Sequence, residues 1–305
     1  MLTNCEAFQP QVYPMMNLAL PLNQSEAFQR TCDKVGLPVE RITNELGTCL
    51  VQSRKLPVLG QFHLLSRGPV LEDPAKLPEF VNQVRGRLSG AMVVNAGDGA
   101  PDIGGLKIAQ GAKLAIVDLV NADEMRTRLH QKWRNQLKKA ERAGLTIIDQ
   151  PLSAMPHSWF LRAEAAQQKA RRYKSYPTGF LLAYATANKG QARLYSAMMN
   201  GEPIAGILVL KHGRMATYQA GVTTPEGRRH CAHNLLLWRA MSDLQRKRFI
   251  QLDLGRADLS EGLRRFKLGT GARVEQLAGS FLSHSWLGRR HVLPVEDAVH
   301  LRHAA

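Results

Sequence analysis

The segment EGLRRFKLGTG, residues 261–271, contains the side chains of this sequence that are best placed to do chemistry. It sets one ammonium group, Lys267, beside an aromatic ring, Phe266, among three glycines at positions 262, 269 and 271. Glycine tolerates backbone angles that other residues avoid and leaves room for a close neighbour, so we expect the chain to turn sharply or approach another group here. A lysine in this setting is a candidate site residue. The alternative is a solvated lysine on a loop beside a core phenylalanine.

Composition places the chain among ordinary globular proteins. Its 305 residues are 44% hydrophobic and 22% charged, which excludes disorder as the main state and suits one large domain or two associated ones. The four cysteines lack the spacing of zinc ligands and indicate a reduced protein without disulfides. His300 and His303 near the end of the chain have no acidic or thiol partners in register, so no metal is expected.

The net charge of +16, from 41 basic and 25 acidic residues, favours anionic partners. These include tRNA or other RNA, CoA, nucleotide-linked substrates and, through peripheral contact, anionic lipid surfaces; the alternative is that the charge only serves solubility. No apolar run approaches the ~18 to 20 residues of a membrane span, and the first residues do not resemble a secretory signal. We therefore expect a cytoplasmic protein without an integral membrane span.

The elements that must position Lys267 begin with a basic helix over residues 123–143. Leu129, Trp133, Leu137 and Ala140 recur at the spacing of a buried helical stripe, and most of the lysines and arginines fall elsewhere. Gly144 is suited to ending this helix. Its basic face could contact phosphates or simply be solvated.

The rest of the chain predicts a mixed sheet. The expected order is a strand at 146–149, a helix at 154–173, strands at 191–200, 202–211 and 215–222, a helix at 233–246 and a strand at 249–254. Strands joined by such short turns must pair antiparallel, which indicates an α+β fold. Neither a dinucleotide fingerprint nor a P-loop is present.

Four strings in this order resemble the FemABX family of aminoacyl-tRNA-dependent peptidyltransferases. They are NQSEAFQ (23–29), LLSRGPVLED (64–73), HQKWRNQLKKAERAGL (130–145) and EGLRRFKLGTGARVEQL (261–277). The resemblance implies an α+β fold of two tandem GNAT-like domains, with mixed, mostly antiparallel sheets flanked by helices. It places the N-terminal domain at 1–144, with the tail 281–305 packed on it, and the acyltransferase domain at 145–280.

The resemblance also implies roles for individual residues. In the family the string that matches Arg265, Phe266 and Lys267 lies beside the cleft, and its lysine is proposed to stabilise charge during acyl transfer. We carry that role onto Lys267, with Phe266 next to it and Arg265 as a substrate-binding residue. RYKSY is similar to the family's pair for a nucleotide-linked acceptor, which implies substrate binding by Arg172 and Tyr176. A structural helix end is the alternative for these two.

The chemistry of acyl transfer suits these residue types. An amine that attacks an ester or thioester builds an oxyanion, and a fixed cation there is worth ~10²- to 10³-fold in rate. No covalent enzyme intermediate and no cofactor are required, and the donor would be aminoacyl-tRNA or acyl-CoA. Asp253 or Asp258 could take the proton from the attacking ammonium, although Asp253 could instead cap the loop after its strand.

One departure from GNAT enzymes bears on the donor. CoA-dependent members hold a pyrophosphate on a glycine-rich turn at a helix start, where this chain has Cys231 and His233. Arg228 and its neighbours could still bind one phosphate. Three functions remain: an aminoacyl or other acyl transferase acting on an amine, an acyl-CoA-dependent N-acetyltransferase, and a nonenzymatic basic RNA- or envelope-binding adaptor.

Overall fold

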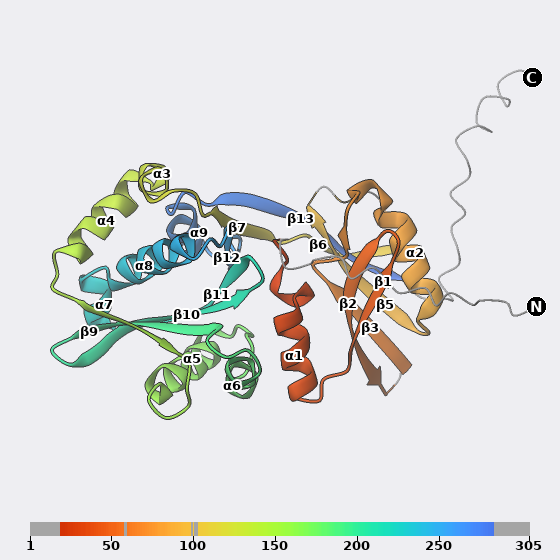
Figure 1. Ribbon diagram of the computed structural model, residues 1–305, viewed down its shortest axis with the longest axis horizontal. Coiled ribbons are helices and arrows are strands. Elements are labelled where there is room, and N and C mark those ends of the chain that lie inside the picture. Colours follow the sequence, from red (N-terminus) through yellow and green to blue (C-terminus); the bar gives the residue numbers. More distant parts are fainter. Residues whose placement is uncertain (1–18, 58–59, 99, 101–102, 284–305) are drawn as a thin grey trace, which may run out of the picture. The chain divides into compact units, whose positions relative to one another are not determined.

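The computed structural model describes residues 19–57, 60–98, 100 and 103–283, which form two compact units (Figure 1). Unit 1 comprises the described residues up to Val39 together with Ala112–Leu277, and unit 2 comprises Glu40–Gly111 and the residues from Ala278 onward. This division does not coincide with a boundary after residue 144, because residues 112–144 pack with those that follow. The tandem-domain organisation stays a prediction, and most of the tail 281–305 and the terminal histidines lie outside the described residues.

Unit 1 is built on a sheet with the strand order β13-β7-β12-β11-β10-β9-β8. Neighbouring strands run antiparallel except for β11 and β12, which are parallel. The strands are β7 (Lys113–Asp118), β8 (Thr146–Pro151), β9 (Ala192–Met199), β10 (Glu202–His212), β11 (Met215–Thr223), β12 (Gln251–Arg256) and β13 (Arg273–Ser283), of which the part to Leu277 belongs to unit 1. The predicted mixed and mostly antiparallel α+β class is confirmed.

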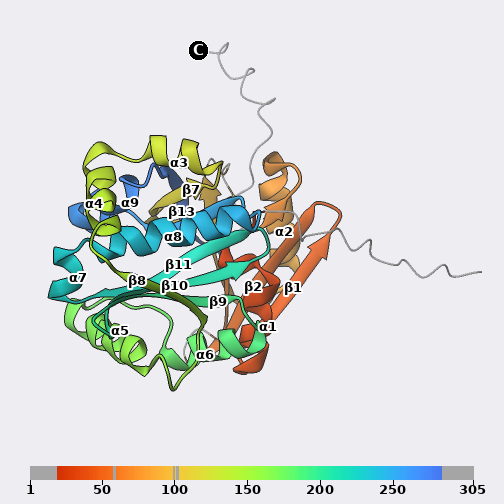
Figure 2. The same cartoon turned by 60° about the vertical axis from the view of Figure 1, so that its left-hand side comes forward.

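Helices cover both faces of this sheet (Figure 2). The helices are α1 (Glu26–Lys34), α3 (Ala122–Arg128), α4 (Gln131–Glu141), α5 (Ser158–Arg171), α6 (Thr178–Ala187), α7 (Pro225–Arg229), α8 (Ala232–Arg246) and α9 (Glu261–Leu268). On one face α8 packs on β9, β10 and β11, with α4 against α8, and their apolar side chains form the main core. The opposite face is covered by α5, α6 and α1.

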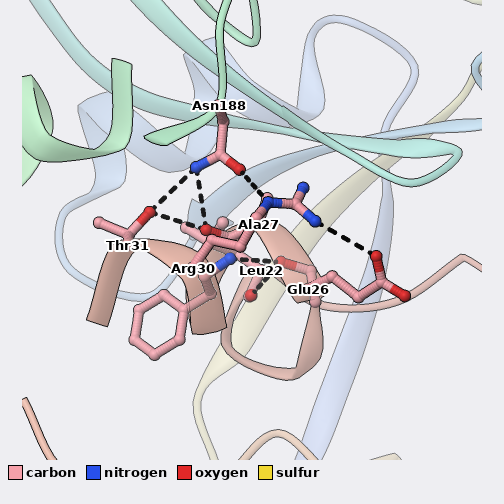
Figure 3. A network of polar contacts seen from close by, with 8 residues as sticks. Leu22, Glu26, Ala27, Arg30, Thr31 and Asn188 are labelled. Carbon is pink, nitrogen blue, oxygen red and sulfur yellow. Dashed lines mark hydrogen bonds and ion pairs between the residues drawn. The ribbon is translucent and has the colours of Figure 1, made fainter. Parts of the chain in front are cut away.

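Helix α1 is fixed to α6 by Asn188, whose buried side chain lies directly after α6 (Figure 3). Its Nδ2 donates to the Ala27 carbonyl at 3.0 Å and to Thr31 Oγ1 at 3.1 Å, and its Oδ1 accepts from Arg30 Nε at 2.9 Å. Ser25 caps the helix by accepting a hydrogen bond from the Phe28 N–H. The N-terminal described segment is thus an integral part of unit 1.

The structure corrects two predicted elements. The single helix expected over 123–143 is broken into α3 and α4 at Leu129 and His130, where Leu129 is extended and buried. The predicted stripe of Trp133, Leu137 and Ala140 is buried as expected. The turning segment expected at 261–271 is instead a helix over most of its length, because Ser260 caps it by accepting from the Leu263 N–H.

The three glycines of that segment differ in what they do. Gly262 lies inside α9 with open space around it, so the expected turn is wrong there. At Gly269 a Cβ would lie 2.7 Å from Trp133 Cδ1, and Gly271 has φ +83° close to the Arg128 backbone. These two glycines let the end of α9 dock where α3 and α4 meet, and His130 N–H donates to the Gly269 carbonyl at 2.9 Å.

Unit 2 has its own smaller sheet in the order β1-β2-β3-β5-β13, with β4 on β2 and β6 on β13. These strands are β1 (Val39–Asn44), β2 (Gly47–Leu56), β3 (Gly60–Ser66), β4 (Val70–Leu71), β5 (Ala91–Asp98) and β6 (Leu106–Gln110). Helix α2 (Leu77–Arg87) packs Leu77, Phe80, Val81 and Val84 into the core of this unit.

Candidate active site

The parallel strands β11 and β12 separate part of the way along their length. They pair over three residues each, and the last pair is Thr217 with Asp253. Beyond it β11 continues to Thr223 and β12 to Arg256, so their carboxyl ends diverge. The region beyond this pair, residues 218–221 of β11 and 254–256 of β12, is called the fork below. Ligands of α/β sheets commonly bind at the carboxyl ends of parallel strands, which makes the fork the candidate site.

Lys267 and Asp253 both lie on the β12 side of the fork. Helix α9 directs Lys267 toward the end of β12, where its Nζ donates to the Arg256 carbonyl at 2.7 Å. Only 8% of Lys267 and 1% of Asp253 is exposed, so the reading of Lys267 as a solvated loop residue is wrong. Burial lowers the pKa of Lys267 to about 8, although the charges of Asp253 and Asp258 act to raise it. The group is therefore mostly an ammonium at pH 7.

Asp253 also has a structural role that the sequence suggested. Its Oδ1 accepts a hydrogen bond of 2.6 Å from the Gly255 N–H, which closes the turn after β12. Asp258 is farther along the loop, where it pairs with Arg256 at 2.9 Å and accepts from the Lys113 N–H. The structure thus brings Asp253, Lys267 and the end of β12 together, and it leaves the role of Asp253 as a base a prediction.

Phe266 packs among aromatic rings. Its ring lies 5.6 Å from His233, edge to face, and 6.2 Å from Trp133. It is half-buried against the main core of unit 1. The contacts of Phe266 are those of a packing residue that also holds His233 in place.

Tyr218 and His233 form a hydrogen-bonded pair on the β11 side of the fork. Tyr218 is the first residue beyond the last β11–β12 pair, and His233 is the second residue of α8. Tyr218 Oη and His233 Nε2 are 2.8 Å apart. Burial lowers the pKa of His233 to about 4 and raises that of Tyr218, so both groups are neutral at pH 7. The sequence analysis missed this pair, and its one signal was a histidine where a phosphate-binding turn would have glycine.

A pocket of about 360 Å³ opens beside β11 and is lined by Lys174, Ser175, Tyr176 and Gln219. Gln219 Nε2 donates to Ser175 Oγ at 2.8 Å, which ties the pocket wall to the strand. The Tyr176 ring stacks on Phe180 with 4.5 Å between centroids, and its hydroxyl accepts from Asn23 Nδ2 at 3.0 Å. The predicted substrate residue Tyr176 therefore lines a pocket that is next to the fork along β11.

The buried carboxylate Glu164 stabilises residues 173–175, of which Lys174 and Ser175 line the pocket. The Tyr173 hydroxyl donates to Glu164 Oε1 at 2.9 Å, and Gln168 Nε2 donates to the same oxygen at 3.3 Å. Gln168 in turn accepts from the Ser175 N–H at 3.1 Å. Burial raises the pKa of Glu164, while these donors act to lower it. Glu164 is thus an organiser of residues 173–175 that the sequence analysis did not identify.

The predicted arginines lie at exposed positions on helices. Arg172 ends α5 in the left-handed conformation, with φ +53°, which fits the helix-end alternative. Arg228 donates to the Thr223 carbonyl at 3.1 Å, and Arg265 pairs with Glu261 at 3.6 Å. These contacts do not gather the three arginines at the fork, and their binding of substrate stays a prediction.

The turn before α8 uses its amide groups internally. The Gly227 N–H donates to Thr224 Oγ1 at 3.1 Å and the Arg228 N–H to the Thr224 carbonyl at 3.0 Å. The His230 N–H donates to the Glu226 carbonyl and the Cys231 N–H to the Arg228 carbonyl, each at 3.1 Å. The N–H groups of Gly227, Arg228, His230 and Cys231 are therefore not free to bind a pyrophosphate.

Comparison with known proteins agrees with this geometry. Residues 127–273 match the family model described as an acetyltransferase (GNAT) domain. This region is therefore a GNAT domain, and the protein is a transferase of the acyltransferase type. No curated protein matches the chain in sequence.

Solved structures extend the likeness to most of the chain. A crystal structure of FemX has a TM-score of 0.69 at 14% identity and covers 86% of this chain and 92% of its own. The C-terminal domain (DUF2156) of a putative lysylphosphatidylglycerol synthetase from Agrobacterium fabrum has a TM-score of 0.57 at 16% identity, covering 85% and 88%. L-PGS from Bacillus licheniformis has 0.54 at 15% identity, covering 86% and 94%. The predicted FemABX-like fold of the GNAT superfamily is confirmed.

Two further findings concern partners. In the described part of the chain, no helix has the length and apolar character needed to cross a bilayer. Among the same residues, no group of three or more His, Cys, Asp or Glu side chains is arranged to hold a metal ion.

Proposed function

We propose that this protein transfers an aminoacyl or other activated acyl group from a donor in the fork to an amine acceptor, without a covalent enzyme intermediate. The observation that carries this proposal is the buried ammonium of Lys267 at the end of β12, beside the point where β11 and β12 separate. A cation held there without free rotation can stabilise the oxyanion that forms when the amine attacks the acyl carbonyl. The negative charge of Asp253 acts to raise the pKa of Lys267 and so favours its charged form.

Aminoacyl-tRNA is the donor we favour over acyl-CoA. The amide groups of the turn before α8 are bonded within that turn, and Cys231 and His233 follow it where a phosphate cradle needs glycine. One structural relative is named for lysylphosphatidylglycerol, an aminoacylated lipid. The basic charge of the chain also suits a polyanionic donor.

The pocket beside β11 is the proposed entry of the acceptor. Gln219 lines the pocket and lies two residues beyond the last β11–β12 pair. The pocket and the fork therefore share this residue. Lys174 offers a cation for an acidic or nucleotide-linked acceptor, and Tyr176 offers a flat apolar ring. The amine would approach the acyl carbonyl from this side.

A donor screen tests the proposal directly. Purified protein is incubated with aminoacyl-tRNAs and with acyl-CoAs, together with a panel of amines that includes UDP-linked peptides, and amide products are detected by mass spectrometry. Transfer from aminoacyl-tRNA is the expected result. Transfer from acyl-CoA alone would reassign the protein to CoA-dependent N-acetylation, which the matched GNAT domain also allows. RNA binding without transfer from any donor would favour the adaptor.

The role of Lys267 is tested with Lys267→Met, which keeps most of the side-chain volume and removes the charge. Transfer should fall at least ~10²-fold while the folded fraction is unchanged. The matched control is Lys211→Met, which removes a half-buried lysine from β10 that contacts the Phe249 ring. Equal turnover in both variants would contradict the assignment of Lys267.

A further inference from the structure

The helices α5 and α6 and the segment 172–177 that joins them expose charge of one sign only. They lie side by side on the sheet face opposite α8 and are called the α5–α6 layer below (Figures 1 and 2). Between residues 152 and 190 the single acidic residue is Glu164, which is buried. Six exposed cations in this stretch form no ion pair with any described residue: Arg162, Lys169, Arg171, Arg172, Lys174 and Lys189.

Uncharged and apolar side chains lie between these cations. Residues 175–188, which include all of α6, contain no charged side chain. On α6, Gly179 and Thr186 are exposed and Leu182 is half-buried, so the outer side of this helix is uncharged as well. In the turn before α5, Met155 is 86% exposed, more than any other large apolar side chain in the described part of the chain.

We propose that the α5–α6 layer docks on the surface of a bilayer that contains anionic lipids. Clusters of lysine and arginine next to apolar side chains bind such surfaces, because the cations attract the headgroups while the apolar groups enter the interface. Three of the four residues that line the pocket belong to this layer: Lys174, Ser175 and Tyr176. Together with the proposed function, on which this consequence rests, docking brings the entry of the acceptor to a lipid surface.

The basic helix α4 differs from this layer and shows why a lipid surface fits better than RNA. The exposed residues of α4 are all polar or charged, and its apolar residues are buried. Cations alone suffice to neutralise the phosphates of a nucleic acid. An uncharged helix and an exposed methionine among the cations add nothing to such binding, whereas a membrane interface contacts both kinds of side chain.

Vesicle binding tests the charge of the layer without donor or acceptor. The protein is sedimented at physiological salt with vesicles of phosphatidylcholine alone, and with vesicles that contain about one third phosphatidylglycerol. Binding to the anionic vesicles only is expected. Each lysine or arginine near such a surface contributes roughly 5-fold in affinity, so replacing four by glutamine should weaken binding at least about 50-fold. The four are chosen outside the pocket: Arg162, Lys169, Arg171 and Lys189.

The matched control removes the same charge from α4 by replacing Lys132, Lys138, Lys139 and Arg142 with glutamine. Helix α4 packs on α8, on the other face of the sheet, and charges are screened over about 8 Å at physiological salt. This control should therefore keep its vesicle affinity within about 5-fold. Equal losses in both variants would mean that net charge alone attracts the lipid, which would overturn the inference. A layer variant that loses affinity for tRNA but not for lipid would overturn it too.

Single substitutions test the uncharged part of the layer. Thr186→Glu places a carboxylate on the exposed side of α6 and should weaken binding to the anionic vesicles about 5-fold. Thr127→Glu on α3 is its control, because both hydroxyls donate to the carbonyl four residues earlier, at 2.7 Å and 2.9 Å. Met155→Gln should likewise weaken binding more than Leu259→Gln, a change at an exposed leucine before α9. Equal effects within each pair would place the contact elsewhere and contradict the proposal.

The docking surface and the proposed function fail separately. A protein that binds anionic vesicles through this layer but transfers no acyl group in the donor screen would contradict the proposed function and leave the docking surface standing. A protein that acylates soluble amines but binds neither kind of vesicle would keep the proposed function and overturn the docking surface. The variant of Arg162, Lys169, Arg171 and Lys189 should retain the wild-type rate with a soluble amine, since these four side chains lie outside the pocket and the fork.

Discussion

Lys267 experiences two opposing effects at the end of β12. Burial disfavours its charge, while Asp253 and the Arg256 carbonyl favour it. The result is a pKa of about 8, which keeps the side chain charged at neutral pH but ready to lose its proton above it. A buried charge that depends on its partners in this way is more common at functional sites than on surfaces.

This environment predicts how stability depends on pH. The pKa of Lys267 is about 8 in the folded chain and 10.5 ordinarily, so between these values the unfolded chain binds more protons. The cost of the buried charge is fully present below pH 8 and disappears as pH rises to 10.5. Relative to Lys267→Met, the wild-type free energy of unfolding should therefore rise by about 1 to 3 kcal/mol across this window. Urea unfolding at a series of pH values measures it, and parallel curves for the two proteins would mean a solvated lysine.

At the scale of elements, the sequence predicted those features that depend on local pattern. The stripe of Trp133, Leu137 and Ala140 follows from helical periodicity alone, and the strands β9 to β11 follow from short turns and apolar runs. The segment 261–271 was predicted to turn because glycines suggest turns. It is helical because Ser260 caps it and because Gly269 is needed for contact with Trp133, a residue more than a hundred positions away.

The candidate site was predicted only in part for the same reason. Lys267 and Tyr176 were found because they stand in recognisable strings. The pair of Tyr218 and His233 depends on a strand and a helix meeting across the fork, which no local pattern records. Glu164 was missed for the same reason. From the sequence alone a carboxylate on α5 is expected at the surface, and it is buried only because α5 packs on β11.

The attachment of α1 gives a prediction for the element scale. Asn188→Ala removes the hydrogen bonds to Ala27 and Thr31 and leaves Arg30 without its amide partner. Because Asn188, Ala27 and Thr31 are buried, the free energy of unfolding should fall by about 1 to 3 kcal/mol. Hydrogen exchange of the α1 amides should accelerate more than that of α8. Thr186→Ala, on the exposed face of α6, is the control and should change stability by less than about 0.5 kcal/mol.

At the scale of the whole molecule, the net charge of +16 means that many basic side chains have no acidic partner. Helix α4 and its C-cap residue expose four basic side chains that form no ion pair within the described part of the chain: Lys132, Lys138, Lys139 and Arg142. Its other arginine, Arg134, donates to the carbonyls of Thr127 and Leu129 and serves the break between α3 and α4. The exposed four are therefore available to a polyanion such as the tRNA of the proposed donor.

This availability predicts a salt dependence. Each phosphate neutralised by a lysine or arginine contributes about 0.7 to 0.9 to the slope of log affinity against log salt. Replacing Lys132, Lys138, Lys139 and Arg142 by glutamine should therefore lower the slope for aminoacyl-tRNA by about 3 if all four contact phosphates. Fluorescence anisotropy of labelled tRNA between low and physiological salt measures it.

The control for this prediction removes the same charge from unit 2. Arg54, Lys55, Lys76 and Lys107 are exposed there, so replacing them by glutamine matches the change in net charge. If the net charge alone attracts the RNA, both quadruple variants should lose affinity and slope equally, since long-range attraction depends on the total charge. A loss confined to the α4 variant would identify that helix as the contact. A slope that neither variant changes would show that the polyanion binds elsewhere on the chain, and tRNA contact through α4 would be wrong.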